Sequence, residues 1–429
     1  MTDYLAFPPA TGVRGSVAAP PSKSATNRAL VLASLSETAV AIAGPLESED
    51  TRALSRCLAA MGARFETVPG GVRVGGPLAG PDDRETLLDA GESGTAARFL
   101  AAVASATPGR FLLTGAGRLR ERPVGELVDA LRSAGAAIAY AGAPGHLPLA
   151  ITGGSLRTAR IAVDASRSSQ FLSALLLAAP AVPGGLAVVS TAGVASAPYV
   201  ETTLECLRAF GHEVSGSLAA AEGIRVKRGE GISRRYEVPG DYSSALPLLA
   251  AAGAAGGEVS VTGLVTPSAD ADARALPVLE RLGVKLAWGA GSVTGRARRG
   301  ALSPVTVVAT DFPDAVPALA ALAALAPGES RFEGIAHLRL KESDRIAALA
   351  ALLTAAGARA SAREESLIVE GPAGPRAGGA VRLPTFGDHR IAMAGGLLSL
   401  ALPGLLIESP DCVSKSYPSF FEDLATIRY

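Results

Sequence analysis

The sequence predicts an α/β protein of six repeats, each running approximately β-α-β-α-β-β and stacked three and three into two domains. Two observations predict this fold class. A polar cluster that leads into an Ala/Leu-rich helix occurs six times, at steps of 70, 74, 75, 71 and 74 residues, and similar elements follow it in the same order. A fixed period over the whole length is the signature of a repeat architecture. The six anchor positions are Ser24, Gly94, Ser168, Ser243, Asp314 and Asp388.

The first of these helices follows the double proline Pro20-Pro21 and runs into an apolar stretch at residues 30–35. Serine and threonine at a helix start satisfy free backbone N–H groups. Lys23 and Arg28 lie in the first turns, where the helix dipole already favours negative charge. Such cations suit a bound anion better than they suit the helix. An ordinary capped helix with two solvated cations is the alternative interpretation.

The later elements of each period follow the same order. A Gly or Pro-Gly turn leads to a short β-like run, as at residues 110–114, 186–189, 258–261 and 405–407. A polar loop and a second helix with apolar residues at helical spacing come next. Most of these second helices end in glycine, as expected for a helix stop: Gly62, Gly135, Gly211, Gly283 and Gly357. Two alternating runs close most units, such as residues 135–140 with 147–151.

Composition excludes several classes of protein. The 429 residues include 40 basic and 40 acidic side chains, so there is no bulk field to hold nucleic acid or an anionic membrane. Three distant cysteines, Cys57, Cys206 and Cys412, predict a reduced compartment without disulfides, and no spacing predicts a metal site. Residues 168–200 carry no charge, but their Pro and Gly interruptions predict a buried helix and strand rather than a membrane span. With no signal peptide in residues 1–14, we expect a soluble, cytoplasmic protein.

Cations recur at the helix starts and in the second loops, at residues 118–123, 337–345 and 414–418. If the first helices point the same way, these cations gather in one cleft with few acids among them: Lys23, Arg28, Arg122, Lys341, Arg345, Arg390 and Lys415. This density fits two multiply charged anions bound side by side. Asp314 and Glu342 stand in the same field, and a carboxylate pair near a lysine suits reversible proton transfer to an oxygen and a carbon. Their protonation states stay open, because cations favour ionisation while burial opposes it.

One alternative interpretation of these motifs stays open, and three other kinds of site are not supported by the sequence. The run at residues 341–345 could be a solvated, ion-paired helix start. The sequence has no Gly-rich dinucleotide fingerprint and no phosphate-loop motif. His389 has no serine or cysteine nucleophile at a recognised spacing, so a hydrolase triad is not supported.

Three motifs, at residues 20–30, 93–98 and 338–345, resemble the 5-enolpyruvylshikimate-3-phosphate synthase family over the full length. The resemblance implies two inside-out α/β domains, residues 21–238 and residues 1–20 plus 239–429, with the active site in the cleft between them. It implies transfer of the enolpyruvyl group of phosphoenolpyruvate to the 5-hydroxyl of shikimate 3-phosphate, releasing phosphate by addition and elimination. It also implies that the reaction uses no metal or organic cofactor. We further expect a monomer that binds neither nucleic acid nor membrane.

The resemblance carries over to individual residues. The residues that match shikimate 3-phosphate positions are Lys23, Ser24, Arg28, Ser168, Ser169, Gln170, Ser196, Tyr199, Asp314, His337 and Lys341. Those that match phosphoenolpyruvate positions are Lys23, Gly94, Arg122, Gln170, Arg345, Arg390 and Lys415. The catalytic positions fall on Asp314 for the 5-hydroxyl proton and on Glu342, with Lys23 nearby, for the methylene proton.

Three positions depart from the family pattern. Glu92 stands where asparagine is usual and would repel phosphoenolpyruvate unless it pairs with Arg122 or Arg98. His337 replaces a frequent asparagine but can still donate a hydrogen bond, and Arg167 adds a cation.

Two other functions are weighed against this one. A related transferase moves enolpyruvyl onto UDP-N-acetylglucosamine, but it usually carries a reactive cysteine in the loop that is residues 118–122 here, and this loop has none. A non-catalytic clamp around nucleic acid is disfavoured by the zero net charge.

Overall fold

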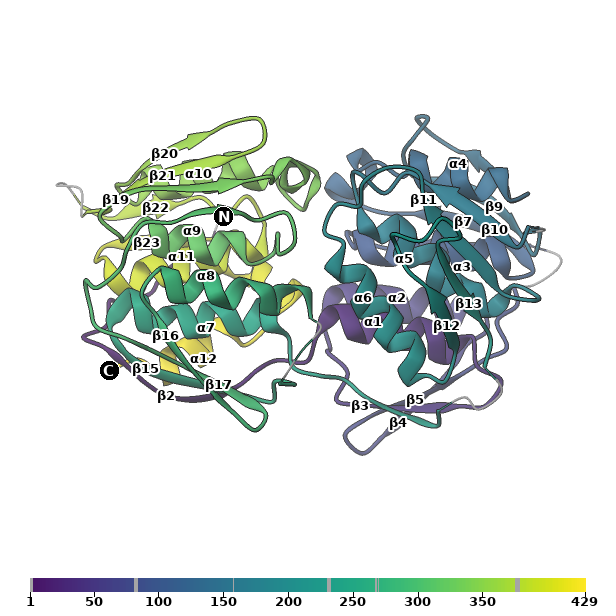
Figure 1. Cartoon of the computed structure of the whole chain (residues 1–429), viewed down its shortest axis with the longest axis horizontal. Coiled ribbons are helices and arrows are strands. Elements are labelled where there is room, and N and C mark those ends of the chain that lie inside the picture. Colours follow the sequence, from purple (N-terminus) through teal and green to yellow (C-terminus); the bar gives the residue numbers. More distant parts are fainter. Residues whose placement is uncertain are drawn as a thin grey trace. The chain divides into compact units, whose positions relative to one another are not determined.

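A computed structural model shows a chain folded as two compact units (Figure 1). The continuous unit is Pro21–Val238, and the discontinuous unit joins Met1–Pro20 to Pro239–Tyr429. The structure describes residues 3–80, 84–156, 158–229, 233–266, 268, 270–374 and 379–429.

In its described residues, the continuous unit contains six α-helices and three four-stranded sheets. Its helices are α1 (Lys23–Ser34), α2 (Glu49–Ala60), α3 (Gly94–Ala106), α4 (Gly125–Ser133), α5 (Ser169–Ala178) and α6 (Pro198–Ala209), with short 3₁₀ turns η1 (Gly117–Glu121) and η2 (Ala179–Ala181). Its strands are β3 (Val40–Ala43), β4 (Arg64–Val68), β5 (Gly71–Gly75), β6 (Glu85–Asp89), β7 (Gly109–Thr114), β8 (Ala137–Tyr140), β9 (Leu149–Gly153), β10 (Arg160–Val163), β11 (Leu186–Ser190), β12 (Glu213–Gly216), β13 (Ile224–Lys227) and β14 (Arg235–Glu237). The sheet orders are β14-β3-β5-β4, β6-β7-β9-β8 and β10-β11-β13-β12.

The discontinuous unit follows the same plan. Its helices are α7 (Tyr242–Ala255), α8 (Leu276–Arg281), α9 (Val316–Ala323), α10 (Arg345–Ala355), α11 (His389–Ala401) and α12 (Phe420–Thr426), with 3₁₀ turns η3 (Ala271–Ala275), η4 (Ala336–Leu340) and η5 (Pro410–Lys415). Its strands are β1 (Tyr4–Ala6), β2 (Val13–Ala18), β15 (Gly257–Thr262), β16 (Lys285–Gly289), β17 (Ser292–Ala297), β18 (Thr306–Val308), β19 (Gly328–Glu333), β20 (Arg359–Ala362), β21 (Leu367–Gly371), β22 (Val381–Leu383) and β23 (Leu405–Glu408). The sheet orders are β2-β15-β17-β16, β18-β19-β21-β20 and β1-β23-β22.

Three helices form the centre of each unit, and the sheets lie outside them. The central helices are α1, α3 and α5 in one unit and α7, α9 and α11 in the other. They consist mainly of alanine and leucine, and every residue of α7 is buried. A helix that is apolar on all sides has to be enclosed. The strands alternate buried and exposed residues, as in β10, so one sheet face covers the helices and the other meets solvent. The predicted α/β fold class is confirmed.

Among the described residues, five of the six sheets share one pairing pattern. In the second repeat, β6 and β7 are parallel neighbours on either side of α3 in the chain, and the hairpin β8-β9 adds antiparallel to β7. This is the predicted order of elements, and it recurs in the third and fifth repeats without change.

The first, fourth and sixth repeats contain strand pairings that the order of elements along the chain does not indicate. Strand β2 precedes α1 in the chain but pairs in parallel with β15, from Val13↔Gly257 to Ala18↔Thr262. Strand β14 precedes α7 but pairs in parallel with β3. Strand β1 pairs antiparallel with β23, in place of the closing hairpin of the sixth repeat. Each unit therefore takes a strand from the part of the chain that precedes the other unit's first helix.

Helix starts and stops lie close to where the sequence predicts them. Side chains of Ser22, Ser93, Ser168, Asp241 and Asp388 accept backbone N–H bonds at the starts of five central helices. The stop glycines have φ between 88° and 111°, which a glycine adopts without steric strain: Gly62, Gly135, Gly211, Gly283 and Gly357. The uncharged segment at residues 168–200 is α5 followed by β11, as predicted.

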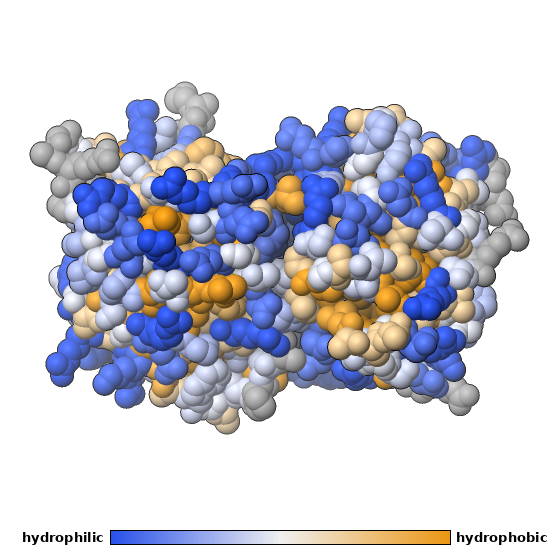
Figure 2. All heavy atoms as spheres, turned by 45° about the horizontal axis from the view of Figure 1, so that its top comes forward, coloured by the Kyte–Doolittle hydropathy of each residue, from blue (hydrophilic) through white to orange (hydrophobic). Residues whose placement is uncertain are grey.

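The surface mixes polar and apolar residues. On the face shown in Figure 2, hydrophobic residues form small patches between hydrophilic ones. Within the described ranges, no helix combines the length and the apolar character needed to cross a membrane. The three cysteines are free thiols.

A glycine at the end of β9 gives the first prediction. An alanine at Gly153 would place its Cβ 1.9 Å from the carbonyl oxygen of Thr107 and 2.1 Å from that of Ala104. Because these are backbone atoms at the end of α3, we expect Gly153→Ala to lower the free energy of unfolding by about 1–3 kcal/mol, measured by urea denaturation. Gly193→Ala is the control, since nothing lies within 4 Å of its Cβ. Equal unfolding midpoints for the two variants would contradict the proposed crowding.

Candidate active site

The start of α1 carries an ion pair in the continuous unit. Lys23 is the first helical residue, behind the cap Ser22, whose hydroxyl accepts from Ala25 N. Lys23 Nζ lies 3.0 Å from Asp50 Oδ2 on α2, and both side chains are largely shielded from solvent. Lys23, which is predicted to contact both substrates, is thus paired with Asp50, an acid to which the sequence analysis gave no role in the site.

Arg28 joins α1 to α6. Its Nε donates to Thr203 Oγ1 at 2.8 Å, Nη1 to the Ser24 carbonyl at 3.0 Å and Nη2 to the Tyr199 carbonyl at 3.1 Å. The guanidinium also lies over the Phe99 ring, 5.5 Å from its centroid. Arg28 therefore brings together the predicted site residues Ser24 and Tyr199.

A second cluster joins the starts of α3 and α5. Arg98 donates to the Gly94 carbonyl and to Gln170 Oε1, both at 3.0 Å, and Gln170 Nε2 donates to Thr95 Oγ1 at 3.1 Å. An added Cβ at Gly94 would lie 2.5 Å from Nη1 of both Arg98 and Arg122. Among the described residues, nothing hydrogen-bonds the buried Arg122 Nε. Two guanidinium groups thus crowd the start of α3, where backbone N–H groups also favour an anion.

The remaining predicted residues of this unit lie at the starts of α5 and α6. The Ser168 hydroxyl caps α5 by accepting from Gln170 N, and Ser169 follows it, buried. Ser196 is buried with φ of 55°, a conformation that non-glycine residues rarely adopt. Such backbone strain is often found at functional sites.

Two of the three departures from the family pattern belong to this unit. Arg167 pairs with Glu126 at 2.9 Å on the surface, so its extra charge is balanced. The Glu92 carboxylate lies against the start of η1, where an added Cβ on Gly117 would be 2.3 Å from Oε1.

Arg345 organises the site residues of the discontinuous unit. It is the first residue of α10 and its side chain is 1% exposed. Nε donates to Asp388 Oδ2 at 2.8 Å, Nη1 to Asp314 Oδ1 at 2.7 Å and Nη2 to Glu342 Oε2 at 2.8 Å. Burial opposes its charge, but Asp388, Glu342 and Asp314 outweigh burial and raise the pKa of Arg345 well above its usual value. Both predicted catalytic acids are therefore held by one guanidinium.

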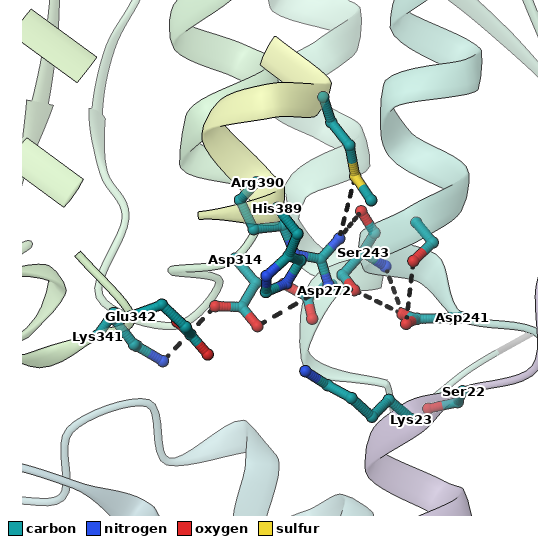
Figure 3. Close-up of polar contacts among 12 residues, drawn as sticks. Ser22, Lys23, Asp241, Ser243, Asp272, Asp314, Lys341, Glu342, His389 and Arg390 are labelled. Atoms are coloured by element: carbon teal, nitrogen blue, oxygen red, sulfur yellow. Dashed lines mark hydrogen bonds and ion pairs between the residues drawn. The ribbon is translucent and has the colours of Figure 1, made fainter. Parts of the chain in front are cut away.

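Asp314 is surrounded by cations. Besides Arg345, it faces Lys341 Nζ at 3.5 Å and Arg390 Nη2 at 4.0 Å (Figure 3). Burial favours the neutral acid, but Lys341, Arg345 and Arg390 together hold the pKa of Asp314 well below its usual value. Asp314 is thus an ionised carboxylate in the free protein. This resolves the protonation state that the sequence left open for this residue.

Arg390 links α11 to the start of α7. Its Nη1 donates to the Ser243 carbonyl at 2.9 Å, and Nη2 bonds to the Ser243 hydroxyl. That hydroxyl in turn donates to Asp241 Oδ1 at 2.6 Å (Figure 3). With Asp314 just before α9, the starts of the three central helices meet at the same end of this unit.

His337 and Lys415 complete the predicted set. His337 lies in η4, and burial, with a smaller effect of Lys341, lowers its pKa to about 4. A neutral imidazole at neutral pH can still donate one hydrogen bond, like the asparagine it replaces. Lys415 is buried at the end of η5, after β23.

The charge balance of the discontinuous unit includes one further acid. The sequence analysis placed two acids, Asp314 and Glu342, among the cations, and in the discontinuous unit Arg345 also pairs with a third, Asp388. The sequence analysis did not assign site roles to several residues that hold this arrangement: Asp50, Arg98, Asp241, Ser243 and Asp388. The caps Asp241 and Asp388 could have been suspected from their positions before the helix starts. Arg98 ends the motif at residues 93–98, which the sequence analysis had singled out, whereas nothing local marks Asp50.

The two clusters suit anion chemistry with proton transfer. Partly buried cations at helix starts bind phosphate and carboxylate groups. An ionised Asp314 beside Glu342 provides acid and base groups at one point. The described residues contain no group of three or more His, Cys, Asp or Glu side chains placed to hold a metal ion.

Comparison with known proteins assigns this arrangement to a family. Residues 8–424 match the family model for EPSP synthase (3-phosphoshikimate 1-carboxyvinyltransferase). The chain belongs to the EPSP synthase family. Enzymes of this family, like this chain, are transferases of the shikimate pathway, which leads to aromatic amino acids. The reaction expected from the resemblance is confirmed in preference to transfer onto UDP-N-acetylglucosamine.

Individual relatives cover nearly the whole chain. The 3-phosphoshikimate 1-carboxyvinyltransferase of Methanoculleus marisnigri is 40% identical over 95% of both chains. That of Serratia proteamaculans is 37% identical over 100% of this chain and 99% of its own. The crystal structure of EPSP synthase from Acinetobacter baumannii superposes with a TM-score of 0.80 at 27% identity, covering 100% of this chain and 98% of that one.

The crowding at Gly94 leads to a prediction about substrate affinity. Because the new methyl group would displace the guanidinium groups of Arg98 and Arg122, we expect Gly94→Ala to raise the KM for phosphoenolpyruvate about tenfold, corresponding to about 1.4 kcal/mol. Steady-state kinetics would measure it. Gly125→Ala is the control at the nearby start of α4, where the closest atom would lie 3.6 Å away. An unchanged KM in Gly94→Ala would rule out this role of the glycine.

His337 leads to a prediction about stability and pH. Its pKa is lowered from 6.5 to about 4 on folding, so between these values the unfolded chain binds a proton that the folded chain does not. Stability therefore falls as pH falls through this window, by about 2 kcal/mol at pH 5 for this residue. We expect His337→Asn to lose correspondingly less stability than the wild type between pH 7.5 and pH 5 in urea unfolding. Parallel pH dependences would contradict a neutral His337.

Proposed function

We propose that the two clusters bind shikimate 3-phosphate and phosphoenolpyruvate and carry out the family's enolpyruvyl transfer. The observation that carries this proposal is the pair Asp314 and Glu342, held on one buried arginine and, at Asp314, kept ionised by neighbouring cations. An acid and a base fixed on a common support, among cations that suit anionic substrates, are what addition followed by elimination requires.

Proton transfer is assigned to three residues. Asp314 takes the proton of the 5-hydroxyl as that oxygen attacks carbon 2 of phosphoenolpyruvate. Glu342, with Lys23, delivers a proton to the methylene carbon, giving a tetrahedral intermediate. Glu342 then takes back one methyl proton as phosphate departs, which restores the double bond. In the free protein Asp314 is a weak base because its pKa is low, and anions bound to the cations around it would raise that pKa.

Substrate binding is assigned to the side chains around these groups. The phosphoenolpyruvate residues are Lys23, Gly94, Arg122, Gln170, Arg345, Arg390 and Lys415. The shikimate 3-phosphate residues are Lys23, Ser24, Arg28, Ser168, Ser169, Gln170, Ser196, Tyr199, Asp314, His337 and Lys341. Arg345 already donates to three carboxylates. These bonds use four of its five N–H groups, so a direct contact with a substrate would use the second N–H of Nη1 or replace one of the carboxylates.

The location of the substrates, the compartment, the oligomeric state and the absence of cofactors are part of the same proposal. The prediction that both substrates use residues from both units in one cleft comes from the sequence and the family. So do the predictions of a cytoplasmic monomer without metal or organic cofactor.

Phosphate release from phosphoenolpyruvate tests the proposed reaction. We expect release only when shikimate 3-phosphate is the acceptor, with no release when UDP-N-acetylglucosamine replaces it. Release with the second acceptor alone would overturn the proposed substrate, while release with neither would overturn the proposed activity.

The acid/base assignment leads to its own prediction. Asp314→Asn and Glu342→Gln keep size but remove a titrating group, so we expect each to lower kcat at least about 100-fold with the circular dichroism spectrum unchanged. Asp311→Asn is the matched control, because Asp311 lies three residues from Asp314 but pairs with Arg274 on the surface. Near-normal turnover in either catalytic variant would remove its assignment.

A further inference from the structure

An acid on α2 lies directly against the lysine assigned to phosphoenolpyruvate. Asp50 Oδ2 is 3.0 Å from Lys23 Nζ, and the two side chains are 6% and 15% exposed. Both residues belong to the continuous unit, on helices that pack against each other. A pair this shielded is screened by salt much less than a surface pair.

The start of α2 is satisfied without Asp50. Ser48 caps the helix by accepting from Thr51 N, and Thr51 Oγ1 accepts from Ser48 N in return. Glu49 supplies a carboxylate for the helix dipole in the same turn. The Asp50 side chain turns instead toward α1, where an unpaired ammonium at the first residue would oppose the dipole. The ion pair therefore serves Lys23 rather than α2.

A cavity of about 380 Å³ connects this pair with the loop that precedes α3. It is lined by Glu49, Asp50, Arg52, Ala53, Arg56, Ala90, Gly91 and Glu92. The charged side chains that line this cavity together with Asp50 are Arg52, Arg56, Glu49 and Glu92. Gly94 follows two residues after Glu92, so Asp50 borders the same cavity as the loop that leads into the second predicted anion-binding cluster.

We propose that Asp50 is the positioning residue of Lys23, holding its ammonium group protonated and directed for phosphoenolpyruvate. This inference rests on the proposed function of Lys23. Removing the Asp50 charge leaves an ammonium at a helix N-terminus, where the charged form is disfavoured. The pKa of Lys23 then falls, and the site loses a binding charge as pH rises.

The test is the pH profile of kcat/KM for phosphoenolpyruvate between pH 6.5 and 9.5. We expect Asp50→Asn to raise the KM for phosphoenolpyruvate about tenfold at pH 7.5 with a smaller change in kcat. The deficit relative to wild type should grow toward pH 9.5, and Asp50→Glu, which restores the charge, should recover most of it. Glu49→Gln is the matched control, since it removes a carboxylate from the same helix turn without touching Lys23, and we expect a wild-type profile.

Three results would overturn the proposal. One is a deficit in Asp50→Asn that is the same at every pH. Another is an equal deficit in Glu49→Gln, which would indicate a role in the helix alone. The third is tighter binding of phosphoenolpyruvate by Asp50→Asn, which would show that Asp50 competes with the substrate for Lys23.

Lys23→Met separates this proposal from the proposed function. If Lys23→Met binds phosphoenolpyruvate normally, the role assigned to Lys23 fails, and the inference about Asp50 fails with it. If Lys23→Met loses affinity but Asp50→Asn does not, only the role of Asp50 fails. We expect the double variant to be no worse than Lys23→Met alone, because Asp50 acts through the lysine.

Discussion

The site of the discontinuous unit depends on the burial of one guanidinium. Arg345 is almost entirely out of contact with solvent, and a buried ion is stable only when its donors are matched by acceptors. Asp314, Glu342 and Asp388 supply those acceptors from the chain before α9, the chain before α10 and the start of α11. Removing one partner from such a network typically costs about 3–5 kcal/mol. The two carboxylates proposed to be catalytic, Asp314 and Glu342, are therefore coupled to the helix starts that carry them.

A second constraint is the composition of the central helices. Alanine and leucine form most of their surface, so three helices can pack closely inside three sheets. This packing brings helix starts together at one end of the discontinuous unit, where caps such as Asp388 occupy some N–H groups and cations collect beside the rest. In the continuous unit, the starts of α3 and α5 are likewise joined, by the hydrogen bond from Arg98 to Gln170. A fold whose core is helical thus concentrates positive charge without a metal ligand or a glycine-rich phosphate loop.

Much of this could be predicted from the sequence, because the relevant signals are local. Polar caps before apolar runs placed the central helices, and the stop glycines such as Gly62 placed the ends of the second helices. The strand exchange could not be predicted this way, because nothing in residues 13–18 indicates a partner near residue 257. The same holds for the site: Lys23 and Arg345 stand out by their motifs, whereas Asp50 is an ordinary acid in the first turn of an amphipathic helix. Its role depends on a neighbour 27 residues away that only the packing of α1 on α2 brings close.

The exchanged strands also determine the order in which the two units can complete their sheets during synthesis. The continuous unit receives its last strand, β14, by residue 237, so all its partners exist while the second half is still unmade. The discontinuous unit cannot close early, because β2 has no neighbour until β15 emerges, and β1 waits for β23 at residues 405–408. The first strands made are thus among the last to be paired. Between the completion of β14 at residue 237 and the synthesis of β15 at residues 257–262, the chain can carry a folded unit preceded by a segment that contributes nothing to that unit's sheets.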